Sequence, residues 1–172
     1  MLRALIASVI LVFAASAFSQ PLTLRDFAVG RIHLKARLDS VTQNLGPAID
    51  TTKIETESGP FFWLRFKGLS IWTDASHSIA AIDISSSAYR TSRGVKIGDS
   101  LAYVERSYGP KKGRDFEKVF EREYKIYDTR FVAYNYYVDY ELHPNDNHAY
   151  YIDFFIRGGH VVKIYLYVGL MD

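Results

Sequence analysis

Two histidines have a spacing that suits a metal ion. His143 and His148 bracket Asn145-Asp146-Asn147 in one predicted turn. Imidazole and carboxylate groups are common zinc ligands, but a tight site takes three or four of them. The run His-Pro-Asn-Asp-Asn is also ordinary turn chemistry, because Pro, Asn and Asp favour turn conformations. The pattern favours a turn, and we predict neither a metal nor a cofactor.

A second group of side chains could do acid–base chemistry. Asp139 and Asp153 fall in neighbouring predicted strands, and Tyr137 precedes the first of them. Two carboxylates about 5–10 Å apart in a cleft would suit glycoside hydrolysis. With Lys163 nearby, the same pair is also typical of cross-strand salt bridges. The second interpretation fits better, so we expect a non-enzymatic protein. The alternative is a small-ligand-binding protein or hydrolase that uses the concave sheet as a pocket.

Other nucleophilic and phosphate-binding motifs are absent from the sequence. It has no cysteine and no Gly-x-Ser-x-Gly, which excludes thiol chemistry and a serine elbow. Gly158-Gly159 lies between two predicted strands rather than before a helix, so it does not form a phosphate loop. With 21 Lys and Arg against 19 Asp and Glu, interspersed along the chain, there is no basic stripe for nucleic acid.

Aromatic residues alternate along the predicted strands. Side chains in a strand point to opposite faces in turn, so each strand divides into two sets. One set is aliphatic and suits a core, as Ile152, Phe154 and Ile156 do. The other set mixes aromatic and charged residues and is our candidate surface for a protein partner: Phe61, Trp63, Arg65, Trp72, Tyr137, Asp139, Tyr151, Asp153, Phe155, Lys163, Tyr165 and Tyr167.

This second face has two interpretations. Large, rigid aromatic side chains bury much area at low entropic cost, and together with arginine they are typical of protein-binding surfaces. The same residues would also suit a face covered by a terminus or loop, or cross-strand pairs that stiffen the sheet. A contiguous exposed patch would favour binding, because solitary surface aromatics are normal.

An internal repeat indicates which elements carry these strands. Residues 94–110 and 30–47 match at an offset of 63, with apolar residues and a Gly-Pro ending in register. In the second copy Asp99 or Ser100 can cap a helix that ends at Gly109-Pro110. In the first copy the helix is expected from about Ala36 to Leu45.

Short strands follow each predicted helix, joined by tight turns, so they should pair antiparallel. The stretch Phe131–Leu142 is either one bent strand or two. The fold class predicted is α+β, with two tandem helix–meander repeats (residues 20–87 and 88–172) that one continuous sheet could unite. The expected strands are Phe61–Lys67, Leu69–Thr73, Ile79–Ser85, Glu121–Tyr127, Phe131–Leu142, Ala149–Ile156 and Val161–Tyr167.

The run from Thr91 to Pro110 resembles the short-helix signature of bacterial envelope domains of the BamE type. It also looks like the tandem domains of beta-lactamase inhibitory protein. The residues that carry the likeness are Gly94, Gly98-Asp99, Val104 and Tyr108-Gly109. The resemblance implies helical units packed on antiparallel sheets and an inhibitor or an envelope assembly or accessory factor. The chain departs from both in having no cysteine, hence neither a lipid anchor nor disulfides.

The first 19 residues predict export. Arg3 precedes an apolar run, Ala4–Ala15, that is too short to span a bilayer. Cleavage would fall after Ala17 or, better, after Ser19; a buried N-terminal helix is the alternative. We expect a periplasmic or secreted protein, soluble after cleavage and with no membrane span. Its partner would be a protein of the envelope or extracellular space, and a structural envelope protein without a specific partner is a third possibility.

Overall fold

The computed structural model describes residues 21–57, 59–110, 132–141 and 147–170. The predicted signal peptide, the predicted strand Glu121–Tyr127 and His143 lie outside these residues. In the described part of the chain, no helix is long and apolar enough to cross a membrane. The elements are η1 (Leu24–Asp26), β1 (Ala28–Val29), β2 (Ile32–His33), α1 (Leu38–Leu45), β3 (Asp50–Thr56), β4 (Gly59–Phe66), β5 (Leu69–Thr73), β6 (Ile79–Ile84), α2 (Leu101–Tyr108), β7 (Val132–Glu141), β8 (Asn147–Arg157) and β9 (His160–Leu170).

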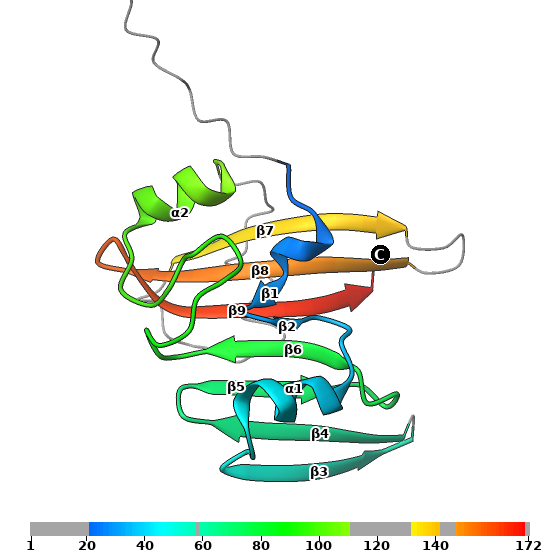
Figure 1. Ribbon diagram of the computed structural model, residues 1–172. Coiled ribbons are helices and arrows are strands. Elements are labelled where there is room, and N and C mark those ends of the chain that lie inside the picture. Colours follow the sequence, from blue (N-terminus) through cyan, green and yellow to red (C-terminus); the bar gives the residue numbers. More distant parts are fainter. Residues whose placement is uncertain (1–20, 58, 111–131, 142–146, 171–172) are drawn as a thin grey trace, which may run out of the picture.

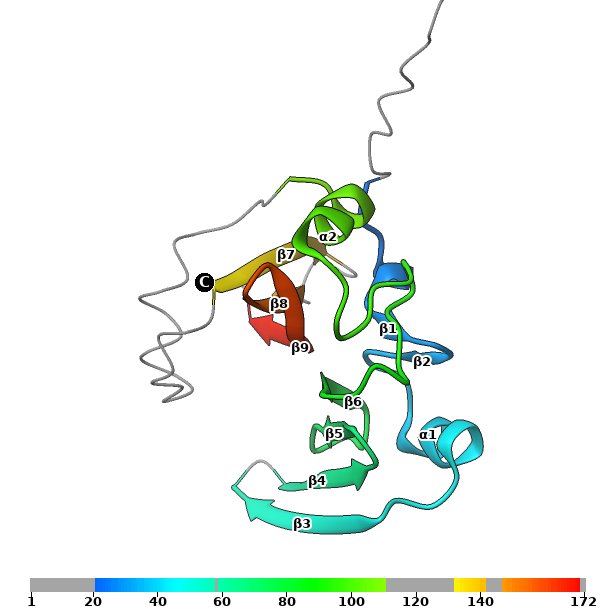
Figure 2. The same ribbon diagram turned by 90° about the vertical axis from the view of Figure 1, so that its left-hand side faces the viewer.

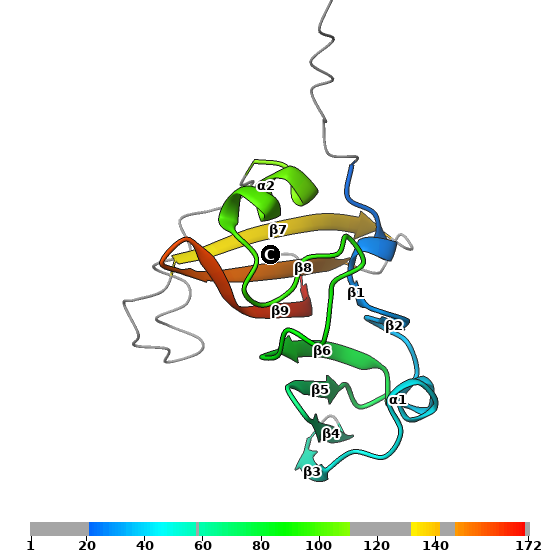
Figure 3. The same ribbon diagram turned by 60° about the vertical axis from the view of Figure 1, so that its left-hand side comes forward.

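Seven strands form one antiparallel sheet in the order β3-β4-β5-β6-β9-β8-β7 (Figure 1). The α+β class and the short antiparallel connections are confirmed, and both halves of the chain contribute to this single sheet. The stretch left open as one strand or two is one strand, β7. The strands change direction steadily from β3 to β7, which is the usual twist of a sheet (Figure 3).

The helices and the small β1–β2 hairpin lie on one side of the sheet (Figure 2). The core forms between them and the aliphatic sheet face, where Ile71, Ile82 and Leu166 pair side by side and are fully buried. Each helix contributes a fully buried valine, Val41 from α1 and Val104 from α2. Among the described elements, none lies against the opposite face of the sheet.

Both helices end as their sequences predict. Gly46 and Gly109 have φ of 75° and 88°, and each donates its N–H to a carbonyl of the last turn. Ser100 caps α2 by accepting a hydrogen bond from the Tyr103 N–H at 3.3 Å. The first helix begins at Leu38 rather than Ala36, because Lys35 takes a φ of 63° and Arg37 bridges to Ser78.

The segments that enter the two helices make matching hydrogen bonds. Lys35 N–H donates to Ile79 and Leu38 N–H to His77, while Ile79 N–H donates back to Ala36. At the offset of 63, Gly98 N–H donates to Val161 and Leu101 N–H to Gly159, while Val161 N–H donates back to Asp99. Each helix is therefore fixed to the turn of a later hairpin in the same way.

The central strands β6 and β9 pair around a local two-fold axis. Ile82 pairs with Leu166 and Ile84 with Ile164, on either side of the pair Asp83–Tyr165. Both flanking hairpins also carry an irregularity at corresponding places, at Trp72/Thr73 and Phe155/Ile156. These features support the tandem repeat of whole helix–meander units, which itself stays a prediction.

Strand β3 was missing from the predicted elements. Its sequence, Asp-Thr-Thr-Lys-Ile-Glu-Thr, has one large apolar residue and no alternation of apolar and polar residues. The strand lies at the edge of the sheet, and its residues from Thr51 to Thr56 are exposed on both faces. Because neither face of this strand is buried, its sequence does not need alternating apolar residues.

Candidate functional site

The strand register places all twelve candidate binding residues on the sheet face opposite the helices. Trp63 pairs with Trp72, and Tyr151 pairs with Tyr167 on one side and Tyr137 on the other. Arg65, Tyr165 and Asp153 follow in the adjacent row of that face. Side-chain geometry is described for the candidates on β4, β5, β8 and β9; for Tyr137 and Asp139 on β7, only the register is described.

Five of these residues form a continuous ring ladder, which we call the aromatic face: Trp63, Trp72, Tyr165, Tyr167 and Tyr151. The Trp63 and Trp72 rings stack with centroids 5.8 Å apart and planes 10° apart. Trp72 meets Tyr165 edge to face at 6.2 Å. The ladder continues by stacking of Tyr165 on Tyr167 at 5.2 Å and of Tyr167 on Tyr151 at 4.8 Å.

Small residues make room for this ladder. Ala81 lies between Trp72 and Tyr167 in the register, so the Trp72 ring can reach across β6 to Tyr165. Gly169 lies beneath Tyr151: a Cβ there would stand 2.8 Å from the ring. In β-sheets an aromatic ring often packs over a glycine of the neighbouring strand, and this contact fixes the position of the ring.

Charged groups flank the ladder in compensated pairs. The Arg65 guanidinium lies 5.1 Å from the Trp63 ring centroid and binds Asp50 through Nε at 3.0 Å and through Nη2. Lys163 Nζ lies 2.8 Å from Asp83 Oδ2 and 5.9 Å from the Tyr165 ring centroid. The face therefore presents aromatic rings beside two cations, each of which is balanced by a carboxylate.

Burial divides the ten candidates whose side chains are described. The five ladder residues and Phe61 are half-buried, and Arg65 is exposed. Asp153 and Phe155 are buried, with 0% and 4% of their surface exposed, so they do not lie on the accessible part of the face. These two residues were expected to bind a partner directly, and their burial corrects that expectation.

Ring geometry also bears on the two interpretations of this face. Neighbouring rings cover each other's planes, so part of the aromatic area serves cross-strand packing. The Trp63 Nε1 atom is buried and has no hydrogen-bond partner in the described part of the chain. Each of the five ladder residues is half-buried, so part of every side chain from β4, β5, β9 and β8 remains accessible.

The acid–base constellation is not assembled. Asp139 lies opposite Ala149, and Asp153 lies opposite Asn135. Asp153 lies four positions after Ala149 along β8, or about 13 Å at the rise of a strand. The prediction that the two carboxylates face each other on neighbouring strands was wrong, and Lys163 pairs instead with Asp83 of β6.

The metal interpretation gains no support from the described residues. His148 lies in β8 opposite Tyr140 and Leu170, while His143 is outside the described ranges. Within those ranges no three His, Cys, Asp or Glu side chains are grouped as a metal site would require.

Comparison with family models, curated proteins and solved structures finds no match to this chain. The resemblance to BamE-type domains and to beta-lactamase inhibitory protein therefore stays an expectation.

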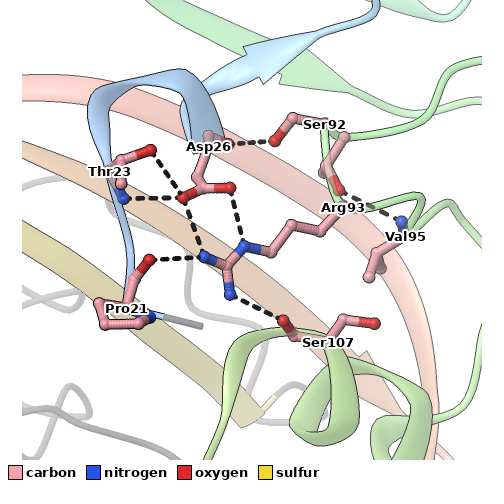
Figure 4. Close-up of polar contacts among 8 residues, drawn as sticks. Pro21, Thr23, Asp26, Ser92, Arg93, Val95 and Ser107 are labelled. Carbon is pink, nitrogen blue, oxygen red and sulfur yellow. Dashed lines mark hydrogen bonds and ion pairs between the residues drawn. The ribbon is translucent and has the colours of Figure 1, made fainter. Parts of the chain in front are cut away.

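A polar cluster on the helix side was not predicted from the sequence (Figure 4). Arg93 forms a two-pronged ion pair with Asp26, Nε to Oδ1 at 2.8 Å and Nη2 to Oδ2 at 2.9 Å. Two of its other N–H groups donate to the carbonyls of Ser107 at 2.9 Å and Pro21 at 3.0 Å. One guanidinium thus joins the N-terminal segment to the end of α2.

Burial and hydrogen bonding shift the pKa values of three groups in this cluster. Burial alone would raise the pKa of Asp26, but hydrogen bonds from Arg93 and Thr23, together with the Arg93 charge, hold the pKa below its ordinary value. The hydrogen bonds to Asp26 hold the pKa of Arg93 above its ordinary value. Tyr108 packs against the guanidinium at 5.3 Å, and burial raises the pKa of its phenol to about 12.

Proposed function

We propose that this chain is an exported, non-enzymatic protein that binds another protein through the aromatic face. The observation that carries the proposal is the unbroken ladder of five aromatic side chains from four strands, on a face that no described helix or strand covers. Contiguous aromatic patches flanked by arginine are typical of interface centres, where aromatic residues supply most of the binding energy.

The role of the protein would be that of an inhibitor or an envelope assembly or accessory factor. The predicted export signal and the resemblance to BamE-type domains favour the envelope or the extracellular space. The compensated pairs Arg65–Asp50 and Lys163–Asp83 would lie at the rim of the interface, where charges set orientation more than affinity.

The experiment is capture of partners from the native envelope and secreted fractions with the purified protein and two variants, Trp63→Ala and Tyr151→Ala. We expect both variants to lose the captured partner. Glu105→Ala, an exposed position on α2, is the matched control and should retain it.

Folding is controlled separately in this experiment. Trp63→Phe preserves an aromatic ring and removes an indole N–H that has no acceptor in the described chain, so its thermal stability should match the parent. If well-folded Trp63→Ala and Tyr151→Ala variants capture the same partners as the parent, the proposed face is wrong.

A further inference from the structure

Strand β3 forms one edge of the sheet, and no other described strand or helix pairs with its outer side, which we call the open edge (Figure 1). Residues Thr51 to Thr56 are all exposed in the folded chain. Ile54 is 45% exposed, which is unusual for a large aliphatic side chain in the middle of a strand. An open strand edge is a template for pairing with another strand, so its backbone direction decides what can bind.

The contacts of β4 decide which residues of β3 turn their backbone N–H and C=O groups toward the open edge. Phe62 donates its N–H to Thr73 Oγ1 at 3.0 Å, on the β5 side, so this N–H points away from β3. Pro60, two residues earlier, has no N–H to donate. Antiparallel pairs alternate, and Lys53 and Glu55 lie opposite Phe62 and Pro60. Lys53 and Glu55 therefore turn their own N–H and C=O groups toward the open edge.

We propose that a second copy of this chain pairs with this edge, β3 against β3 in antiparallel orientation. To form backbone hydrogen bonds, residues whose N–H and C=O groups face the open edge must lie opposite each other in the two copies. Centring the pair on residue 53 would oppose two lysines, and centring it on residue 55 would oppose two glutamates, which like-charge repulsion disfavours. Centring on Ile54 places Lys53 of each copy opposite Glu55 of the other, so the charges select this register.

The selected register also accounts for the exposed isoleucine. The two Ile54 side chains meet at the two-fold axis as a non-hydrogen-bonded pair, in which side chains lie closest. Lys53 Nζ and Glu55 Oε1 lie 2.6 Å apart within one strand, so both charges are already held at this edge. Side chains opposite each other share a face, so the paired sheets would present both aromatic faces on the same side. The pairing does not depend on what the aromatic face binds.

Sedimentation velocity over a concentration series tests the pairing in solution. An interface of one edge strand is small, so we expect a reversible dimer of micromolar or weaker affinity. Lys53→Glu and Glu55→Lys each place like charges opposite each other and should weaken self-association about tenfold. Both positions are exposed, and matching thermal melts would show that the fold is intact.

Mixing the two variants separates this pairing from the ion pair within one strand. The Lys53→Glu chain carries two carboxylates at positions 53 and 55, and the Glu55→Lys chain carries two ammonium groups there. Every cross-strand pair of a mixed dimer then joins opposite charges, so this dimer should form at least as well as the parent dimer. Within each variant chain the two positions carry like charges, so restored association must come from contacts between chains. A mixture that associates no better than the separate variants would overturn the proposed register.

A disulfide test checks the two-fold axis directly, because the chain has no other cysteine. Ile54→Cys should oxidise to a covalent dimer, since Cα atoms of a non-hydrogen-bonded pair lie within disulfide range. Ile49→Cys is the control: it is 74% exposed but lies outside β3. Equal cross-linking at both positions would overturn the proposal, and so would a parent protein that stays monomeric at every concentration. The β3 edge would then be available to pair with an extended segment of another protein.

Discussion

Replacing Arg93 by lysine keeps the positive charge but removes the planar fork of donors. In the folded chain the Arg93 guanidinium donates to both oxygens of Asp26 and to the carbonyls of Ser107 and Pro21. A lysine ammonium is a point charge on a flexible stem and cannot satisfy this geometry. The side chains of Arg93 and Asp26 are 13% and 14% exposed, so solvent screens the pair only weakly.

The expected cost follows from these contacts. Hydrogen bonds to charged groups contribute about 1.5–3 kcal/mol each to stability. In Arg93→Lys the new ammonium can still donate to Asp26, so only part of this stabilisation is lost. We expect Arg93→Lys to lower the free energy of unfolding by about 2 kcal/mol, and Arg93→Ala by about 3–5 kcal/mol because it leaves the Asp26 carboxylate unpaired. Urea unfolding followed by far-UV circular dichroism measures both values. Arg25→Lys, at an exposed position of η1, is the matched control and should change stability by less than about 0.5 kcal/mol.

The pH dependence of the pair checks the same reasoning. The pKa of Asp26 is lowered in the folded chain, so its contribution is fully present above the unfolded value of about 3.9 and is lost as pH falls through the folded pKa. Asp26→Asn should therefore reduce the loss of stability seen on acidification. If Arg93→Lys leaves stability unchanged, or if Asp26→Ala and Arg93→Ala are additive in a double-mutant cycle, the two residues are not energetically coupled.

Three further predictions concern single positions. Gly68→Ala should destabilise the protein by more than about 1 kcal/mol in urea unfolding, because φ is 77° and the new Cβ would lie 2.2 Å from that of Ser86; a neutral effect would contradict this geometry. Tyr108→Phe should remove a tyrosine that ionises near pH 12 from the ultraviolet titration. Burial raises the pKa of this phenol, so its contribution to stability should be lost as pH rises from about 10 to 12. Gly169→Ala should displace the Tyr151 ring and change the near-ultraviolet dichroism of the aromatic face with the far-ultraviolet signal unchanged; an unaltered near-ultraviolet signal would mean that the ring does not pack on this glycine.

Sequence alone was sufficient where a local pattern decides the structure. In β8 every second residue from Tyr150 to Ile156 is large, apolar and buried, so alternation separated the two faces there. The C-terminal glycines of both helices were equally local signals. The absence of such a pattern is why β3 was missed.

Local sequence patterns could not predict the contacts between segments that are distant in the chain. Lys163 was expected near Asp139 and Asp153. In the sheet Tyr165, two residues after Lys163, pairs with Asp83 on one side and Asp153 on the other, and the Lys163 ammonium forms its ion pair with Asp83. The register that separates Asp139 from Asp153 depends on where β7 and β8 meet. Asp26 and Arg93 are joined across 67 residues, and neither carries a motif that points to the other.

Site-specific photo-cross-linking is the most direct test of the claim that the aromatic face binds a protein. A photoreactive phenylalanine replaces Trp72 of the ladder in the expressed full chain, and the same residue replaces Glu105 on α2 as the control. We expect irradiation in the native host to give one discrete adduct from position 72, lost when Tyr151 is also changed to alanine, and none from position 105. Equal adducts from both positions, or no adduct from position 72 in a well-folded protein, would contradict the account.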